Sequence, residues 1–178
     1  MKKAILVPIS TIVITALLLF GVSFGLKGVA QKNLQEKRLW LMQTILPESE
    51  VFIEEEYTGE DVNILSVHKA ENGYVVETVV YGYAGNITMF VGVSNEGTVT
   101  GMVVNDLSET YGLGANALTD HAFLAQFLNG EGDFTIGAGV DGITGATVTS
   151  KAIAKSINSA VAFVTGADVE SGATTWGG

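Results

Sequence analysis

The order of strand-like and helix-like stretches most limits the fold of residues 48–164. Five stretches rich in β-branched and aromatic residues come first, and helical periodicity follows only after residue 118. The turn residues Asn95-Glu96-Gly97 predict a hairpin between the last two strands. Strands that precede helices predict an α+β domain with an antiparallel-rich sheet and packed helices. The predicted strands are Val51–Tyr57, Val62–Val67, Tyr74–Tyr81, Ile87–Val93 and Thr98–Val104.

Two helices are predicted after the strands. The first begins near Thr119 or Asp120, either of which suits an N-cap, and ends near Leu128. The second covers Thr149–Val164, where apolar residues recur at a spacing that buries one face. We therefore expect one domain over residues 48–164, followed by a flexible tail rich in Gly, Ala and Thr over residues 165–178.

The N-terminal region contains an uncharged stretch of 23 residues, Ala4–Leu26. At about 1.5 Å per residue, a helix of this length spans a bilayer once. We expect a transmembrane anchor over residues 1–28 and a helical stalk over residues 29–47. A cleaved signal peptide is the alternative, because Gly28-Val29-Ala30 resembles a small-residue cleavage site. Basic residues flank both sides of the stretch, so charge does not decide its orientation.

Charge and cysteine content exclude several classes of function. Residues 41–178 carry three basic and eighteen acidic residues, a net charge of −15, so nucleic acid is not an expected partner. The absence of cysteine excludes disulfides, thiolate-ligated iron–sulfur clusters and thiol nucleophiles. Any electron carried by this chain therefore needs an organic cofactor. His68 and His121 match no metal-ligand spacing, so no metal site is predicted.

The run Asp-Gly-Ile-Thr-Gly-Ala-Thr occupies residues 141–147, immediately before the last predicted helix. A helix N-terminus offers unpaired N–H groups and a positive dipole end, and both favour a phosphate. Lys151 adds a positive charge nearby. A phosphate that is esterified at such a site keeps a single negative charge, which this environment could hold. In the competing structural interpretation, Thr147 or Thr149 is an N-cap and Asp141 a turn former.

A second motif, at residues 108–114, follows the last predicted strand and reads Ser-Glu-Thr-Tyr-Gly-Leu-Gly. Its two glycines permit close backbone approach to a flat ring system. With Phe123-Leu124-Ala125-Gln126-Phe127 and residues 141–147, it resembles a family of FMN-binding subunits. Members typically show Glu-Thr-Pro-Gly-Leu-Gly, Phe-x-x-Gln-Phe and Asp-x-x-(Ser/Thr)-Gly-Ala-Thr in this order. The family includes the G subunit of the Rnf ion-translocating ferredoxin:NAD oxidoreductase and the C subunit of the sodium-translocating NADH:quinone oxidoreductase.

The resemblance spans roughly residues 74–164 and has two departures, Tyr111 for the usual proline and Thr144 for the commoner serine. It implies that a flavin transferase recognises Asp141 and joins FMN through its phosphate to Thr147. It further implies that Glu109 and Thr110 contact the isoalloxazine or ribityl. The remaining cofactor-binding residues that it implies are Gly112, Leu113, Gly114, Thr144, Gly145, Ala146 and Lys151.

The family resemblance also implies a place of action. We expect a single-pass cell-membrane protein with its FMN domain on the extracytoplasmic side. It would relay electrons among the other integral-membrane and redox subunits of an ion-translocating ferredoxin:NAD oxidoreductase. No complete catalytic site is expected in this chain alone. A free-standing extracytoplasmic flavoprotein and a flavin-free acidic interaction module are the alternatives.

Two further patterns in the sequence imitate binding motifs. Residues 137–142 fit Gly-x-Gly-x-x-Gly, but no long βαβ pattern surrounds them and Ala162 stands where an acidic residue is expected. We therefore expect no dinucleotide site. Asp168–Thr174 repeats the pattern of residues 141–147, but too few residues follow it to form a helix. Attachment is accordingly expected at Thr147 rather than at Thr174.

Overall fold

The computed structural model describes residues 2–107 and 119–167. The chain divides into two compact units, Met1–Trp40 and Leu41–Gly178. Helix α1 (Lys2–Ile45) forms the first unit up to Trp40. The end of the helix, from Leu41 onward, belongs to the second unit. The helix runs without a break through the segments predicted as anchor and stalk. Within the two described ranges, no helix combines the length and the apolar character that a membrane crossing requires.

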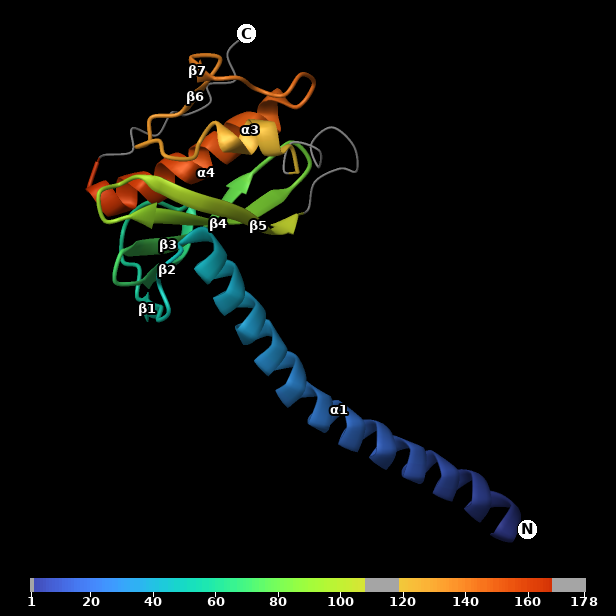
Figure 1. The fold of residues 1–178 in the computed structure, drawn as a ribbon. Coiled ribbons are helices and arrows are strands. Elements are labelled where there is room, and N and C mark those ends of the chain that lie inside the picture. Colours follow the sequence, from blue (N-terminus) through green and yellow to red (C-terminus); the bar gives the residue numbers. More distant parts are fainter. Residues whose placement is uncertain (1, 108–118, 168–178) are drawn as a thin grey trace. The chain divides into compact units, whose positions relative to one another are not determined.

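The second unit is built on a five-stranded antiparallel sheet, with its strands in the order in which they occur along the chain (Figure 1). The sequence predicted all five strands and their antiparallel arrangement. The first strand is shorter than predicted, because it lies at the sheet edge and all three of its residues are exposed. The strands are β1 (Ile53–Glu55), β2 (Ile64–Lys69), β3 (Gly73–Tyr81), β4 (Asn86–Ser94) and β5 (Val99–Leu107).

The predicted hairpin between β4 and β5 is confirmed. Ser94 N donates to Thr98 O at 2.8 Å, and Gly97 N donates to Ser94 O at 3.0 Å. Gly97 has a φ of +90°, a conformation that residues with a Cβ rarely adopt. The turn residues therefore fix the register of the two strands that lead to the second sequence motif.

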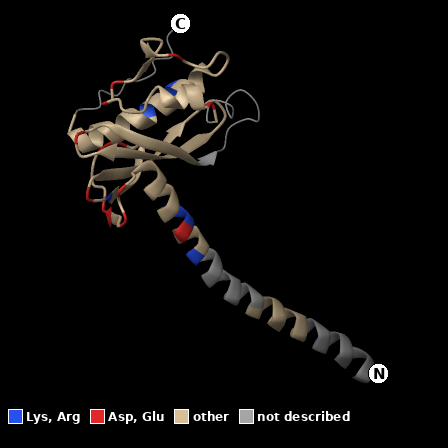
Figure 2. Cartoon of the chain, in the orientation of Figure 1, with Lys and Arg blue, Asp and Glu red and all other residues tan. Residues whose placement is uncertain are grey.

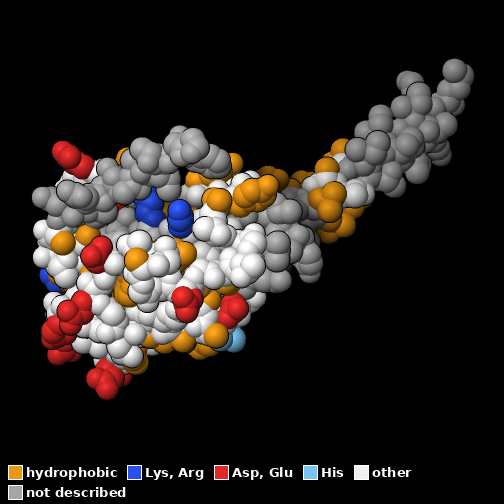
Figure 3. Space-filling model, turned by 90° about the horizontal axis from the view of Figure 1, so that it is seen from above, with side chains coloured by type: hydrophobic (Ala, Val, Ile, Leu, Met, Phe, Trp, Pro, Cys, Tyr) orange, Lys and Arg blue, Asp and Glu red, His pale blue; other side chains and the backbone are white. Residues whose placement is uncertain are grey.

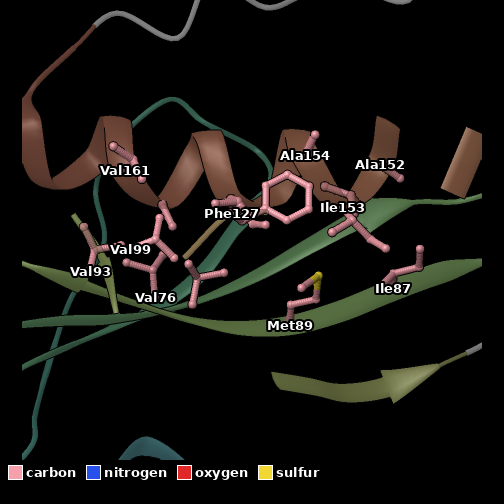
Figure 4. Packing of buried hydrophobic residues seen from close by; sticks show 14 of the residues in the cluster. Val76, Ile87, Met89, Val93, Val99, Phe127, Ala152, Ile153, Ala154 and Val161 are labelled. Atoms are coloured by element: carbon pink, nitrogen blue, oxygen red, sulfur yellow. The ribbon is translucent and has the colours of Figure 1, made fainter. Parts of the chain in front are cut away.

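Helix α4 (Thr147–Thr165) packs against β3 and β4 on one face of the sheet, as Figure 1 shows. Side chains alternate along the strands, so Val76 on β3 and Met89 on β4 point to the same face. They meet Ile153 and Ile157 of α4 in the main core, much of which Figure 4 shows. The helix begins two residues earlier than predicted and ends at Gly166, which adopts a left-handed φ of 68°.

The opposite face of the sheet is covered by the end of α1. Met42, Ile45 and Leu46 are buried with Val75 and Phe90 in a second apolar cluster. For this reason the second unit begins at Leu41, whereas the sequence placed the start of the domain at residue 48. The helix ends at Ile45 and so before Pro47, as predicted.

Helix α3 (His121–Ala125) is shorter than the predicted helix, although Asp120 is its N-cap as expected. Asp120 Oδ1 accepts a hydrogen bond from Phe123 N at 3.0 Å. After Ala125 the backbone continues with the tighter bonds of a 3₁₀ turn, such as Phe127 N to Leu124 O at 3.2 Å. The turn closes at Asn129, which has a φ of 60°.

Two short strands, which were not predicted, precede residues 141–147. We call these residues the attachment motif, after the attachment predicted at Thr147. The two strands are β6 (Thr135–Ile136) and β7 (Gly139–Val140), which pair in parallel as a separate two-stranded sheet. Two residues are too few to produce a recognisable alternation in the sequence. Together with α3, these strands belong to the chain segment that connects the large sheet to α4.

The burial of Phe127 generates a test of this core. Its side chain is fully buried and makes edge-to-face contacts with Phe123 and Phe134, at centroid distances of 5.2 and 5.1 Å. We expect Phe127→Ala to lower the free energy of unfolding by about 3–5 kcal/mol, as measured by denaturant titration. The exposed neighbour Leu128 provides the control, since Leu128→Ala should cost less than about 1 kcal/mol. Similar losses in both variants would contradict the assignment.

Candidate functional site

The run at residues 141–147 forms the connection between β7 and α4. Thr147 is the first residue of the helix, and its side chain is exposed. The preceding Gly145 has a φ of 81°, so the chain turns into the helix through a left-handed residue. The hydroxyl singled out by the sequence therefore stands in solvent at a helix N-terminus.

The start of α4 has no side-chain cap. Ala146 occupies the N-cap position, and no side-chain hydrogen bond to the first turn is made from it. The structural interpretation predicted Thr147 or Thr149 as the N-cap, and this prediction is therefore wrong. Backbone N–H groups in a first turn have no partner within the helix and carry the positive end of its dipole. An anion attached at Thr147 would find these groups within the same turn.

Thr149 lies in this first turn and is fully buried. Its Oγ1 has no hydrogen-bond partner among the described residues. A buried hydroxyl without a partner is unfavourable by roughly 1–3 kcal/mol, so such groups commonly mark a functional position. Thr149 lies two residues along the helix from the exposed Thr147, so its buried hydroxyl is on the core side of α4. The uncapped amides therefore make the start of α4 chemically suited to a phosphate group.

Hydrogen bonds of the Ser150 side chain link the attachment motif to helix α4. Its Oγ accepts a hydrogen bond from Ile143 N at 3.1 Å and donates one to Ala146 O at 3.0 Å. Ala146 N in turn donates to Ile143 O at 3.0 Å. Ser150 therefore holds both ends of the turn between residues 143 and 146. This buried serine was not among the site residues predicted from the sequence.

Gln126 connects the motif to α3. Its Oε1 accepts a hydrogen bond from Asp141 N at 2.8 Å, and its Nε2 donates to Asp141 O at 3.1 Å. The flanking Phe123 and Phe127 are buried, whereas Gln126 is exposed. The Phe-x-x-Gln-Phe pattern thus contains two core side chains and one polar side chain that contacts the attachment motif. The Asp141 side chain is exposed.

Two lysines share the exposed face of α4 with Thr147. Lys151 and Lys155 follow Thr147 at intervals of four residues, and all three side chains are exposed. Residues spaced by four lie on one side of a helix. Figure 2 shows both lysines on α4, and Figure 3 shows two basic side chains next to each other on the face in view. Lys151 was predicted from the sequence and Lys155 was not, although the same four-residue spacing would have found it.

The other predicted contact residues lie outside the described ranges. They belong to the second motif, which follows β5, and are Glu109, Thr110, Gly112, Leu113 and Gly114. Thr174 and the rest of the repeated motif also lie outside. The described part of the site therefore consists of residues 141–151 with Gln126.

The glycines of the Gly-x-Gly-x-x-Gly pattern shape the turn between β6 and β7. Gly137 and Gly139 have φ values of 88° and 107°, and Gly137 N donates to Val140 O at 2.8 Å. Gly142 has a different role, since a Cβ there would lie 2.6 Å from Ile136 Cγ2. The three glycines therefore serve a tight turn and one close contact.

Residues 82–162 match the model of the FMN-binding domain family. The chain is also 34% identical to the G subunit of the ion-translocating oxidoreductase complex of Methanosarcina acetivorans over 145 residues, which are 72% of this chain and 76% of that protein. The chain belongs to this G-subunit family. The family match includes β4, β5, α3 and the attachment motif.

Two further relatives are G subunits of named complexes. The chain is 38% identical to that of the proton-translocating ferredoxin:NAD(+) oxidoreductase complex of Clostridium ljungdahlii, over 52% of this chain and 53% of that protein. It is 33% identical to that of the Na(+)-translocating ferredoxin:NAD(+) oxidoreductase complex of Acetobacterium woodii, over 50% of this chain and 47% of that protein. The aligned region thus spans about half the length of these two relatives. The G-subunit family and its FMN-binding domain support a role in an oxidoreductase complex.

The hydrogen bonds of Ser150 lead to a test of the motif's local structure. We expect Ser150→Ala to leave Ile143 N without a partner and to speed its amide hydrogen exchange by about tenfold or more. Thr165→Ala is the control, because Thr165 Oγ1 makes a comparable bond to Val161 O at the far end of α4. This control should leave the exchange of Ile143 unchanged. Unaltered exchange in Ser150→Ala would show that the serine does not hold the turn.

Proposed function

We propose that this protein carries FMN covalently on Thr147 and relays electrons as a subunit of an ion-translocating ferredoxin:NAD oxidoreductase complex. The observation that carries the proposal is the position of Thr147. It is an exposed threonine at the start of an uncapped helix, inside the FMN-binding domain match. Membership of the G-subunit family supports the electron-transfer role.

Attachment would form a bond between Thr147 Oγ1 and the flavin phosphorus. The threonine hydroxyl loses its proton, and the phosphoanhydride bond of an activated flavin nucleotide breaks, releasing the rest of that nucleotide as the leaving group. The amides of the first turn would then face a single negative charge. Lys151, four residues along the same face, adds a positive charge close to it.

The bound flavin supplies the redox chemistry, and this chain supplies position and electrostatics. In a domain with eighteen acidic and three basic residues, Lys151 and Lys155 are two of the positive charges. Both lie on the face of α4 that bears Thr147. They therefore favour the more negative, reduced form of an attached flavin relative to an otherwise acidic surrounding.

The location and partners of the protein form part of the proposal. The uncharged stretch Ala4–Leu26 supports a single transmembrane anchor. The FMN domain would lie on the extracytoplasmic side, as the family resemblance implies. Other integral-membrane and redox subunits would exchange electrons with it, and a flavin transferase would act on it during maturation. The complexes named for the Clostridium and Acetobacterium relatives support this assembly.

We expect Thr147→Val to abolish an adduct with the mass of FMN minus water. The measurement is intact-mass and peptide mass spectrometry of the full chain, purified from membranes of cells with an active flavin transferase. Thr149→Val and Thr174→Val are the controls. The first preserves side-chain shape in the same helix turn, and the second removes the hydroxyl of the repeated motif. Both should keep the adduct.

Three results would contradict parts of this function. A wild-type chain without any adduct in such cells would favour a flavin-free interaction module. An adduct on Thr174 would place the flavin on the other copy of the motif. A loaded protein that copurifies with no integral-membrane redox subunit would favour a free-standing flavoprotein.

The lysine face gives a second prediction. We expect Lys151→Glu to lower the flavin midpoint potential by roughly tens of millivolts in low salt, because two charge units change at a distance of several ångströms. Redox titration of the loaded full chain measures the shift. Lys69→Glu makes the same charge change on β2 and should shift the potential less. Lys69 Nζ lies over the Tyr74 ring, which packs on Phe163 at the end of α4 opposite to Thr147. An unchanged or raised potential in Lys151→Glu would contradict the role of this lysine.

A further inference from the structure

The contact between Gln126 and the attachment motif has an unusual form. The side-chain amide of Gln126 both accepts from Asp141 N and donates to Asp141 O, at 2.8 and 3.1 Å. This arrangement imitates the pair of hydrogen bonds that two residues exchange across antiparallel strands. A single side chain at the C-cap of α3 therefore fixes the backbone of Asp141 in both directions.

The motif is held at two separate places. Gln126 fixes its first residue, and Ser150 fixes Ile143 and Ala146 near its end. Between them, Gly142 packs so closely on Ile136 that a Cβ would lie 2.6 Å from a methyl group. Loss of the Gln126 contact would free the beginning of the motif while its end stayed attached to α4.

The two hydrogen bonds of Gln126 to the attachment motif go to the backbone of Asp141, and the aspartate side chain remains exposed. Gln126 Nε2 also donates to Phe123 O, within its own segment, at 3.5 Å. The contact with the motif therefore fixes the position of Asp141 without occupying its carboxylate. Thr147 is fixed independently, because it begins a helix whose other face lies in the core. The side chains of Asp141 and Thr147 are thus held in a fixed relation to each other and are both accessible to an enzyme that recognises them.

We propose that Gln126 is a positioning residue for flavin attachment, which presents Asp141 in a fixed relation to Thr147 for the flavin transferase. The proposal rests on the proposed function of Thr147. A flavin transferase that binds only one arrangement of the motif has an apparent affinity proportional to the fraction of molecules in that arrangement. Loss of both hydrogen bonds should therefore raise the KM for this protein about three- to tenfold, with kcat within about twofold of wild type.

The experiment uses the full chain produced without flavin transferase, and then treated with purified transferase and its flavin nucleotide. Gln126→Met keeps the length of the side chain and removes both hydrogen bonds to Asp141, together with the longer one to Phe123 O. Because Gln126 is exposed, this change leaves the core intact. Initial rates of flavin incorporation at several protein concentrations give KM and kcat. Amide exchange of Asp141 reports, without any flavin, whether the contact has been lost.

Asn158 provides a matched control. It brackets the backbone of Phe134 in the same way, accepting from Phe134 N at 2.9 Å and donating to Phe134 O at 3.0 Å. Asn158→Leu should speed the amide exchange of Phe134 and leave the KM for attachment unchanged. A raised KM in Gln126→Met alone, with faster exchange of Asp141, is the expected result.

Equal KM values for wild type and Gln126→Met, with faster exchange of Asp141, would overturn the proposal. So would an equal rise of KM in both variants, because it would indicate general loosening of the domain. Failure of the proposed function looks different, since the wild-type chain itself would then take up no flavin on Thr147.

Discussion

The packing of α4 on the sheet is the interaction on which the rest of this domain depends. Small side chains let the helix approach β3 and β4 closely, while Ile153 and Ile157 fill the space between them. Buried hydroxyls also cross this interface, where Ser156 bonds Thr78, and Ser159 accepts from Asn63. The small residues are Ala152, Ala154, Ser156, Ser159 and Ala160. Because the core holds the helix along most of its length, the helix start has a fixed position.

A helix with one face in the core leaves the opposite face for function. Thr147, Lys151 and Lys155 lie on that face, and their spacing follows from the same helical period that buries Ile153 and Ile157. In a domain with a net charge of −15, attraction for an anion cannot come from overall charge. It must come from the helix dipole, the first-turn amides and these two lysines, all of which are provided by one element.

Local patterns predicted most of the fold. Strand β3 was expected at Tyr74–Tyr81 and occupies Gly73–Tyr81, because buried strands alternate clearly. The helix α3 was overestimated, since the spacing of its apolar residues does not reveal where α-helical bonds give way to a 3₁₀ turn. The contacts of Gln126 and Asn158 were beyond prediction. They join residues 15 and 24 positions apart, and depend on how the elements pack in three dimensions.

The attachment motif satisfies two requirements with separate residues. Gly145 is needed by the backbone, which is left-handed there, and Ala146 is 5% exposed, so a larger side chain would enter the core. The exposed side chains that remain are those of Asp141, Thr144 and Thr147. These three are the polar positions of the pattern Asp-x-x-(Ser/Thr)-Gly-Ala-Thr. Folding therefore accounts for the glycine and the alanine, and the three polar side chains are available for recognition by an enzyme that modifies the folded domain.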